Sequence, residues 1–355
     1  MHLDHLALKE LASQICIAAG TPDHEAKAVA ELLVEANLQG HDSHGVGMLP
    51  IYVRNIKKGF LQPDAHIRKI SESGNLLLLD GQSGFGQIVG PEAMELAIEH
   101  TRHHGVCIMG LKNAHHLGRI GGMGEQAAAA GLISMHYVNV VGHNPLVAPF
   151  GGAQARMNTN PFCCAIPMAD PASPLIFDMA TSTIALGKAR VAFNSGQQVP
   201  TGCLVDHQGL PTREPGVMFN DPMGAMTYLG EHKGFGLALI CELLAGALVG
   251  HWTAQDEHPR PMNVINHMLT IVLDPAVFEN YDDFVTEAEK FVAYIKATTP
   301  AVGTDSVLIP GEPERRNRNQ RLYQGIPVDP GTWQQLLDTA ASVGISEAEC
   351  NSLAN

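Results

Sequence analysis

Apolar residues recur at helical spacing near both ends of the chain. Segment 6–19 predicts one helix, and segment 22–39 predicts a second, with Thr21 as its N-cap. After a proline-rich break the pattern is polar and helical again, with one helix beginning at Pro313 and another at the Asp329-Pro330 pair. We expect these terminal helices to pack together as a helical domain.

The middle of the chain alternates between strand and helix patterns. Short apolar runs predict strands, and longer periodic segments predict helices. The expected strands are 76–79, 106–109, 133–138, 163–166, 175–178 and 268–273, and the expected helices are 91–104, 233–249 and 283–297. We therefore predict an α/β fold in three parts: an N-terminal helical part at 1–73, a mixed α/β domain at 74–304, and a C-terminal helical segment at 305–355 that packs on the N-terminal part.

Two glycine-rich segments resemble the phosphate-binding turn of a Rossmann fold, but neither fits it. In the first, 81–90, Val89 stands where the third glycine is needed and Gly90 comes one residue late. The second, 122–127, matches the Gly-x-Gly-x-x-Ala variant but lies about a dozen residues beyond its nearest predicted strand. If this chain holds a dinucleotide, we expect another fold to hold it.

Charge and composition disfavour several classes of partner. The 36 acidic side chains against 22 basic ones give a formal net charge of -14, which would repel nucleic acid and anionic membranes. Segment 234–250 is short for a membrane span and carries Glu242 near its middle, so a buried core helix is predicted there. The first residues lack the basic start and apolar run of a secretory signal, and we expect a cytoplasmic protein.

Histidines gather in two polar turns that contain glycine. The first turn, 41–45, reads His-Asp-Ser-His-Gly, and the second, 113–118, reads Asn-Ala-His-His-Leu-Gly. Imidazole titrates near neutral pH and suits proton transfer, while Gly118 lets a ligand approach the backbone closely. An isolated histidine is more often a hydrogen-bonded structural residue, but two such turns together favour chemistry.

Metal binding is the competing interpretation of these turns, because they contain five possible zinc ligands: His41, Asp42, His44, His115 and His116. Adjacent histidines and a His-x-x-His turn are not a recognised zinc spacing, so we predict no metal.

Six segments, in order, resemble the malate/L-lactate dehydrogenase family, and the likeness covers nearly the whole chain. They are 41–46, 113–118, 147–152, 158–162, 178–182 and 231–236. The resemblance implies a homodimer in which NAD or NADP lies on domain 74–304, over a largely antiparallel mixed sheet unlike that of Rossmann enzymes.

The resemblance also implies a set of cofactor contacts. Within it, the charges of Arg119 and Lys233 suit pyrophosphate or ribose oxygens, and Thr181 and Ser182 offer hydroxyl donors. The whole set is His44, Gly118, Arg119, Ile120, Asp178, Met179, Ala180, Thr181, Ser182, Lys233, Asn266, Gly311, Glu312, Pro313 and Glu314. Taken alone, Asp178 is equally typical of a strand end. The basic run 315–321 either approaches an adenosine 2'-phosphate or forms a solvated helix face.

Catalytic roles follow from the same resemblance. His116 matches the family's proton acceptor and is predicted to be the general base, while His44, with Ser43, would help to hold nicotinamide or substrate. The sequence leaves the reverse assignment open.

One departure from the family pattern concerns the substrate. Many members place an arginine three residues after the signature glycine, where it clamps the substrate carboxylate, but this chain has Met48 there. Arg54 or Arg119 would have to substitute, and the flexible Met48 suits a larger substrate side chain. We therefore predict a preference for bulky or aromatic 2-oxo acids, such as phenylpyruvate or hydroxyphenylpyruvate, over malate.

The function predicted is hydride transfer between NAD(P)(H) and a 2-hydroxy or 2-oxo carboxylic acid. Three alternatives stay open: a malate/L-lactate dehydrogenase or cyclic imino-acid reductase on the same scaffold, a metal-dependent lyase or hydrolase, and a non-catalytic binding protein. We expect no nucleic-acid or membrane partner.

Overall fold

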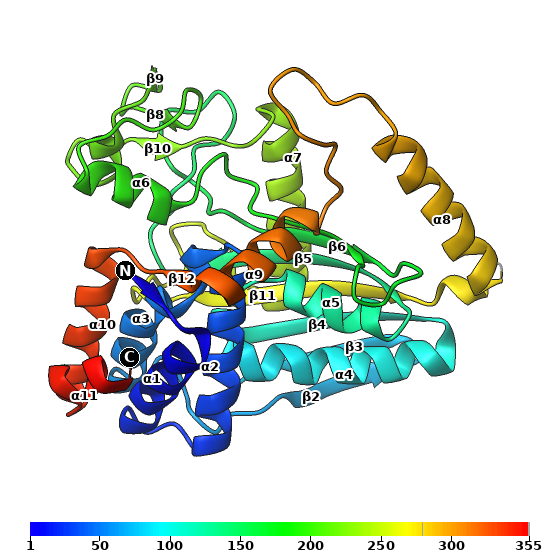
Figure 1. The fold of residues 1–355 in the computed structure, drawn as a ribbon, viewed down its shortest axis with the longest axis horizontal. Coiled ribbons are helices and arrows are strands. Elements are labelled where there is room, and N and C mark those ends of the chain that lie inside the picture. Colours follow the sequence, from blue (N-terminus) through cyan, green and yellow to red (C-terminus); the bar gives the residue numbers. More distant parts are fainter. Residues whose placement is uncertain (279, 354–355) are drawn as a thin grey trace.

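The computed structural model describes residues 1–278 and 280–353 of the chain. Three groups of elements are seen in Figure 1: a cluster of helices that contains both termini, a long sheet, and a smaller lobe above the sheet. Each group has its own cluster of buried apolar residues.

Helices from both ends of the chain share the first of these cores. The helices are α1 (His5–Ala18), α2 (Asp23–Leu38), α3 (Leu49–Lys57), α10 (Pro330–Ser342) and α11 (Glu347–Leu353). Ile15 and Leu33 from the N-terminal helices pack in one cluster with Leu336 from α10. The two-residue strands β1 (His2–Leu3) and β12 (Ile326–Pro327) pair with each other, and α9 (Glu312–Gln324) lies against α2.

The second core lies on one face of a seven-stranded sheet. The strand order is β2 (Arg68–Ser73), β3 (Leu76–Asp80), β4 (Val106–His115), β11 (Ile265–Leu273), β5 (Ile133–Val141), β6 (Phe162–Ile166) and β7 (Leu175–Met179). Only the β3–β4 pair is parallel. The helices α4 (Gly86–His104) and α5 (Gly121–Ala129) lie next to each other on this face. This mixed, mostly antiparallel sheet agrees with the predicted α/β class and is not a Rossmann sheet.

A long apolar helix packs against the other face of the sheet. It consists of α7 (His232–Cys241) followed by the π-helix η4 (Glu242–Gly250), which contacts β4, β5 and β11. In the described part of the chain this helix alone is long and apolar enough to cross a membrane. The predicted core helix is confirmed for one face, with Ala238 and Ala245 buried, but the opposite face exposes Leu239, Ile240, Leu243 and Leu248.

The remaining elements form the smaller lobe and the edges. The lobe contains a three-stranded sheet of β8 (Leu204–Val205), β9 (Pro211–Thr212) and β10 (Ala225–Met226), together with α6 (Leu186–Asn194) and the short helix η3 (Pro215–Met218). The short helix η5 (Pro275–Val277) precedes α8 (Tyr281–Lys296), which lies at the edge of the molecule (Figure 1).

Two predicted helix starts are wrong. The N-cap position of α2 is Pro22 rather than Thr21, whose buried hydroxyl has no hydrogen-bond partner among the described residues. The helix predicted from Pro91 begins five residues earlier, at Gly86, and contains Pro91. Proline is tolerated there because it lies in the second turn, where its missing N–H leaves unpaired only one backbone carbonyl of the first turn.

Candidate active site

The first histidine turn is built on the C-terminal end of α2. Residues 42–44 form a short 3-10 helix, η1, and Asn37 at the end of α2 fixes the turn by donating to Asp42 (2.7 Å) and accepting from the Val46 N–H (2.9 Å). A Cβ at Gly45 would come 2.1 Å from the Asn37 side chain, so only glycine fits this position. Asp42 therefore stabilises the turn, and the turn positions His44.

The second histidine turn follows β4, and its two histidines have different neighbours. His115 is buried and its Nε2 lies 2.9 Å from the amide nitrogen of Asn55. His116 is only half-buried, and its Nδ1 lies 2.8 Å from the Tyr52 hydroxyl. Asn266 fixes the next residue, because its Oδ1 accepts from the Leu117 N–H (2.9 Å). The structure therefore separates a structural histidine, His115, from His116, which stays partly exposed.

The fold brings His44 and His116 together although 71 residues separate them in sequence. Their rings are nearly parallel, with 5.4 Å between centroids. His44 Nδ1 lies 3.0 Å from the Ser43 hydroxyl, and the Ser43 side chain lies close to Gly187 in α6. Ser43, His44 and His116 therefore form one site where η1, the end of β4 and the start of α6 meet.

Burial keeps both imidazoles neutral at physiological pH. It lowers the pKa of His44 to about 4, with His41 and Arg119 adding smaller effects. Burial also holds the pKa of His116 well below its usual range, and His44 beside it lowers this pKa further. A neutral imidazole has one ring nitrogen free to accept a proton, which a general base requires.

Sequence reasoning missed two partners of His116. Gln87 donates from Nε2 to the Tyr52 hydroxyl (2.8 Å), and that hydroxyl in turn meets His116, so three side chains form a buried chain of hydrogen bonds. Tyr52 lies on α3 two turns beyond His44, and Gln87 lies in the first turn of α4, inside the glycine-rich segment that is not a Rossmann turn. No local pattern marks either residue, because both act through contacts that the tertiary fold creates.

A third histidine, His143, also belongs to this surrounding. It acts electrostatically on His116, and burial lowers its own pKa. Its neighbour Gly142 accepts backbone hydrogen bonds from Met262 and Asn263, which tie the loop before β11 to the segment that carries His143.

The predicted cofactor residues lie in several separate segments, the first of which ends the second histidine turn and leads into α5. Arg119 follows His116 by three residues and acts electrostatically on His44; its side chain is 6% exposed and pairs with Glu125 at 2.5 Å. Its Nη1 is buried without a hydrogen-bond partner among the described residues. Gly118 has a φ of +74°, and Ile120 immediately precedes α5. These residues of the second histidine turn lie together.

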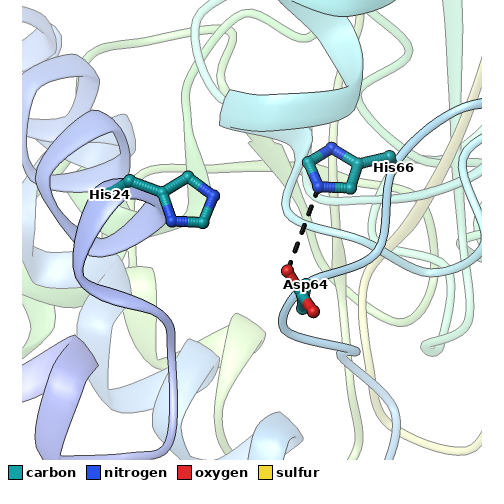
Figure 2. Close-up of side chains that lie close together, drawn as sticks. All are labelled: His24, Asp64 and His66. Carbon is teal, nitrogen blue, oxygen red and sulfur yellow. Dashed lines mark ion pairs between the residues drawn. The ribbon is translucent and has the colours of Figure 1, made fainter.

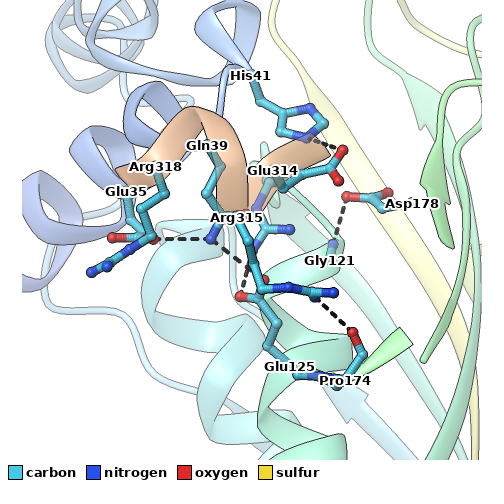
Figure 3. A network of polar contacts seen from close by, with 11 residues as sticks. Glu35, Gln39, His41, Gly121, Glu125, Pro174, Asp178, Glu314, Arg315 and Arg318 are labelled. Carbon is cyan, nitrogen blue, oxygen red and sulfur yellow. Dashed lines mark hydrogen bonds and ion pairs between the residues drawn. The ribbon is translucent and has the colours of Figure 1, made fainter. Parts of the chain in front are cut away.

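Asp178, near the end of β7, caps the N-terminal end of α5. It accepts from the Gly121 N–H at 2.7 Å, as Figure 3 shows. Burial raises the pKa of Asp178, and the nearby Arg119 opposes this rise. The first N–H of α5 is therefore already bound to a carboxylate.

Thr181 and Ser182 direct their hydroxyl groups inward. Thr181 donates to the carbonyls of Thr159 and Asn160, and Ser182 donates to that of Ile184. Met179 and Ala180 are half-buried in the segment between Asp178 and these residues. The two hydroxyl protons are thus committed to the backbone in this structure.

The last predicted group surrounds the start of α9. Gly311 is its N-cap with a φ of +93°, Glu312 and Pro313 begin the helix, and Glu314 lies 3.4 Å from His41 (Figure 3). Glu312 pairs with Lys296. The ion pair between Glu314 and His41 joins this helix to the first histidine turn. Lys233 is exposed in the first turn of α7.

The predicted substrate residues lie on the helical side of the site. Met48 is half-buried and packs against the core of the terminal helices. Arg54 is exposed on α3 and donates to the Met262 carbonyl at 3.4 Å. The arginine run of α9 is used within the protein: Arg315 donates to Pro174, Arg318 pairs with Glu35, and Arg321 pairs with Asp42.

A family model described as malate/L-lactate dehydrogenase matches residues 3–337. Among curated relatives, hydroxycarboxylate dehydrogenase B of Escherichia coli is 45% identical over 95% of this chain and 94% of its own length. L-lactate dehydrogenase of Cupriavidus necator is 40% identical over 98% and 99%.

The chain belongs to the malate/L-lactate dehydrogenase family. It is therefore an NAD(P)-dependent 2-hydroxycarboxylate dehydrogenase by family. An Escherichia coli structure assigned as a malate/lactate dehydrogenase matches with a TM-score of 0.94 and 43% identity over 99% of this chain and 98% of that chain. The Δ1-piperideine-2-carboxylate reductase of Pseudomonas syringae matches with a TM-score of 0.80 and 28% identity over 96% and 100%.

Proposed function

We propose that this member of the family interconverts bulky or aromatic 2-oxo acids and the corresponding 2-hydroxy acids, and that His116 transfers the proton. The observation that carries the proposal is the pair of neutral, facing imidazoles of His44 and His116. A histidine that acts as base must be unprotonated and accessible to the substrate hydroxyl group, and the neutral, half-buried His116 meets both requirements.

The buried chain of hydrogen bonds determines which nitrogen of His116 can act. Nδ1 is bound to Tyr52, which leaves Nε2 for the substrate. In the amide orientation of the structure, Gln87 Nε2 donates to the Tyr52 hydroxyl, which would then donate to Nδ1 and leave the His116 proton on Nε2. Gln87 Oε1 is buried without a hydrogen-bond partner among the described residues, and we propose the flipped amide, in which Oε1 accepts from the Tyr52 hydroxyl, this hydroxyl accepts from Nδ1–H, and Nε2 holds the lone pair. In this arrangement Nε2 takes the hydroxyl proton of a 2-hydroxy acid and returns it in the reverse reaction.

Several residues of the site fit a dinucleotide. The unpartnered, buried Nη1 of Arg119 is suited to a phosphate or ribose oxygen, and the adjacent Gly118, which has a φ of +74°, puts no side chain between the backbone and a ligand. We propose that NAD or NADP binds along the sheet domain, 74–304, where its nicotinamide ring supplies or takes the hydride at the substrate C2. His44, which Ser43 orients, would border that ring.

The substrate preference rests on Met48. It ends a short 3-10 helix, Val46–Met48, between the turn that carries His44 and the helix α3 that carries Tyr52. A methionine offers an apolar, adaptable surface there in place of a carboxylate clamp. Arg119 is held by Glu125, so of the two candidate arginines Arg54 is the one proposed to meet the substrate carboxylate.

A panel of 2-oxo acids with NADH and with NADPH tests the proposal. Following cofactor absorbance, we expect higher kcat/KM with phenylpyruvate and hydroxyphenylpyruvate than with oxaloacetate or pyruvate. Higher kcat/KM with oxaloacetate would contradict the proposed substrate class. The same panel decides between the two cofactors.

A cyclic imino acid belongs in that panel as the second candidate substrate. The observation that favours it is the TM-score of 0.80 to a Δ1-piperideine-2-carboxylate reductase, which is 28% identical. Reduction of this imino acid with a kcat/KM above that of every 2-oxo acid would replace the first proposal.

The predicted homodimer stays a proposal, and the exposed face of the α7–η4 helix is its proposed contact surface. This face presents Leu239, Ile240, Leu243 and Leu248, each at least 40% exposed, along one continuous helix. Adjacent apolar side chains of this kind usually mark an interface. Analytical ultracentrifugation should find a dimer, and Leu243→Asp should give monomers; a dimer that survives this change would exclude the surface.

A further inference from the structure

Two histidines and an aspartate converge at the end of α2 that lies away from the active site. His24 is in the first turn of α2, and Asp64 and His66 are in the loop between α3 and β2. One ligand atom from each lies within 4.8 Å of the others, and Figure 2 shows the three side chains facing a common space. The α2 helix spans 16 residues, so this cluster lies roughly 22 Å along the helix axis from the histidine turn at its other end.

His66 already has the support that a metal-binding histidine needs. Its Nδ1 lies 2.5 Å from Glu92 Oε1, while its Nε2 lies 4.0 Å from Asp64. Glu92 is itself fixed, because its other oxygen accepts from the Ile67 N–H at 3.0 Å. A carboxylate that accepts the proton of one ring nitrogen leaves the lone pair on the other nitrogen, which is the usual arrangement around a metal-bound histidine.

A buried carboxylate stands directly behind the cluster. Glu25 is 1% exposed, and its Oε2 accepts from the Asp64 N–H at 2.9 Å. Its Oε1 is buried with no hydrogen-bond partner among the described residues. An unpartnered buried carboxylate beside the cluster favours a positive charge in front of it.

We propose that His24, Asp64 and His66 bind a divalent transition metal, with Zn²⁺ as the best fit. Two imidazole nitrogens and one carboxylate oxygen are typical zinc ligands, and water would complete the tetrahedron. Ligands of a tetrahedral zinc ion lie roughly 3.3 Å apart. The three exposed side chains reach this spacing by small rotations about their own χ angles.

Such an ion would join the start of α2 to the loop before β2. The ligands come from the terminal-helix cluster and from the segment that leads into the sheet, so the ion would cross-link these two parts. Proton transfer at His116 does not require it. The sequence does not indicate this site, because His24 is 40 residues from Asp64 and neither forms a known metal-binding spacing with its neighbours.

Zinc titration of the untagged, EDTA-treated full chain tests the proposal. By isothermal titration calorimetry at pH 7.5 we expect one Zn²⁺ per chain, with at least a tenfold weaker Kd for His24→Ala, for Asp64→Asn and for His66→Ala. Glu92→Gln keeps the three ligands and should weaken binding by about 10- to 100-fold. Co²⁺ should give the visible absorption of a tetrahedral complex, and dehydrogenase activity should be unchanged in all four variants.

His104→Ala is the matched control, because His100 and His104 lie one turn apart on α4, with ring centroids 5.9 Å apart, and could chelate a metal themselves. This variant should bind zinc as the wild type does. Loss of binding in His104→Ala, binding that survives His24→Ala and His66→Ala, or no Zn²⁺ binding by the wild type would each overturn the proposal.

Discussion

At the scale of single residues, the two facing histidines differ in what holds them. His116 is bound through Nδ1 to Tyr52, which is fully buried, whereas His44 is bound through Nδ1 to Ser43, which is exposed. A proton donor and acceptor needs a fixed ring and a defined free nitrogen. This difference favours His116 for proton transfer and His44 for contact with the cofactor.

Replacing His116 with alanine should therefore slow the chemical step. We expect kcat to fall by about a hundredfold or more, because general acid–base catalysis contributes at least this much. His44→Ala should instead act mainly on the KM for the reduced cofactor. Steady-state kinetics in both directions measure the difference, with circular dichroism as the control for folding; the opposite pattern in the two variants would exchange their roles.

Tyr52 and Gln87 should set the pH dependence of His116 without touching the substrate. Gln87→Glu brings a negative charge behind Tyr52, which favours the imidazolium and should move the acidic limb of kcat/KM for oxidation to higher pH. Tyr52→Phe removes the acceptor for Nδ1–H, which should lower kcat and move the same limb to lower pH. If the acidic limb of kcat/KM stays at the wild-type pH in both variants, these hydrogen bonds only support the fold.

The sequence predicts a residue of this site when its contacts lie within one turn, and misses it when its contacts come from distant segments. His44 and Gly45 lie in one turn, where Gly45 is required by its close contact with Asn37, and the pattern finds them. Tyr52 and Gln87 meet only because α3 and α4 pack against each other at the end of β4. Residue spacing along the chain does not indicate a contact between two distant helices, so the contact between Tyr52 and Gln87 could not be predicted.

At the scale of elements, α9 connects the C-terminal segment to the active site. Arg321 donates to both oxygens of Asp42, at 2.7 and 3.1 Å, and also to the Asn37 carbonyl. Asp42 is the first residue of η1, which positions Ser43 and His44. Within the basic run 315–321, Arg321 fixes the histidine turn, whereas Arg315 binds the Pro174 carbonyl and Arg318 pairs with Glu35.

Arg321→Ala should loosen this turn. A two-pronged arginine–carboxylate pair that is only partly exposed contributes about 1 kcal/mol or more, so we expect a lower Tm by a few degrees and a several-fold lower kcat/KM. Arg316→Ala is the matched control on the same helix, because Arg316 contacts only the Ser306 hydroxyl in the described structure. Equal effects of the two changes would refute the role of Arg321.

The elements that the sequence misses share a physical cause. All six residues of β2 are exposed and mostly polar, so its strand form comes from pairing with β3 rather than from an apolar pattern. The start of α4 was obscured by Gly86 and Gly90, which are weak helix formers but fit beneath Leu117 and Met123. Strands with continuous apolar runs, such as β3 and β11, are predicted within a few residues.

At the scale of the whole molecule, several histidines are buried in a neutral form. Burial lowers the pKa of His44 and His267 to about 4, and that of His115 and His136 to about 3. His136 is typical: hydroxyl groups of Thr270 and Ser134 meet its two nitrogens, and no carboxylate faces it in the described structure. The fold is therefore built for uncharged imidazole at these positions.

Acid should consequently unfold the protein cooperatively. Unfolded histidines titrate near pH 6.5, above their folded pKa values, so between about pH 6.5 and 4 the unfolded chain binds more protons than the native one. Stability is complete above this window and is lost as the pH falls through it. Asp178 and Glu242 act in the opposite direction, because burial raises their pKa values in the folded chain. Their proton uptake in the native state favours folding at low pH. The four buried histidines outnumber these two carboxyl groups.

Urea unfolding at pH 7.5, 6.5, 5.5 and 5.0 measures this effect as the slope of the free energy of unfolding against pH. The slope is proportional to the number of protons that the chain takes up on unfolding. His136→Gln removes one buried titrating group, so this number should fall by about one, even if the stability of the variant at pH 7.5 is lower. His103→Gln is the matched control, because His103 is exposed on α4 and should leave the slope unchanged. A stability that is constant from pH 7.5 to 5.0 would mean that these histidines take up protons without unfolding the chain.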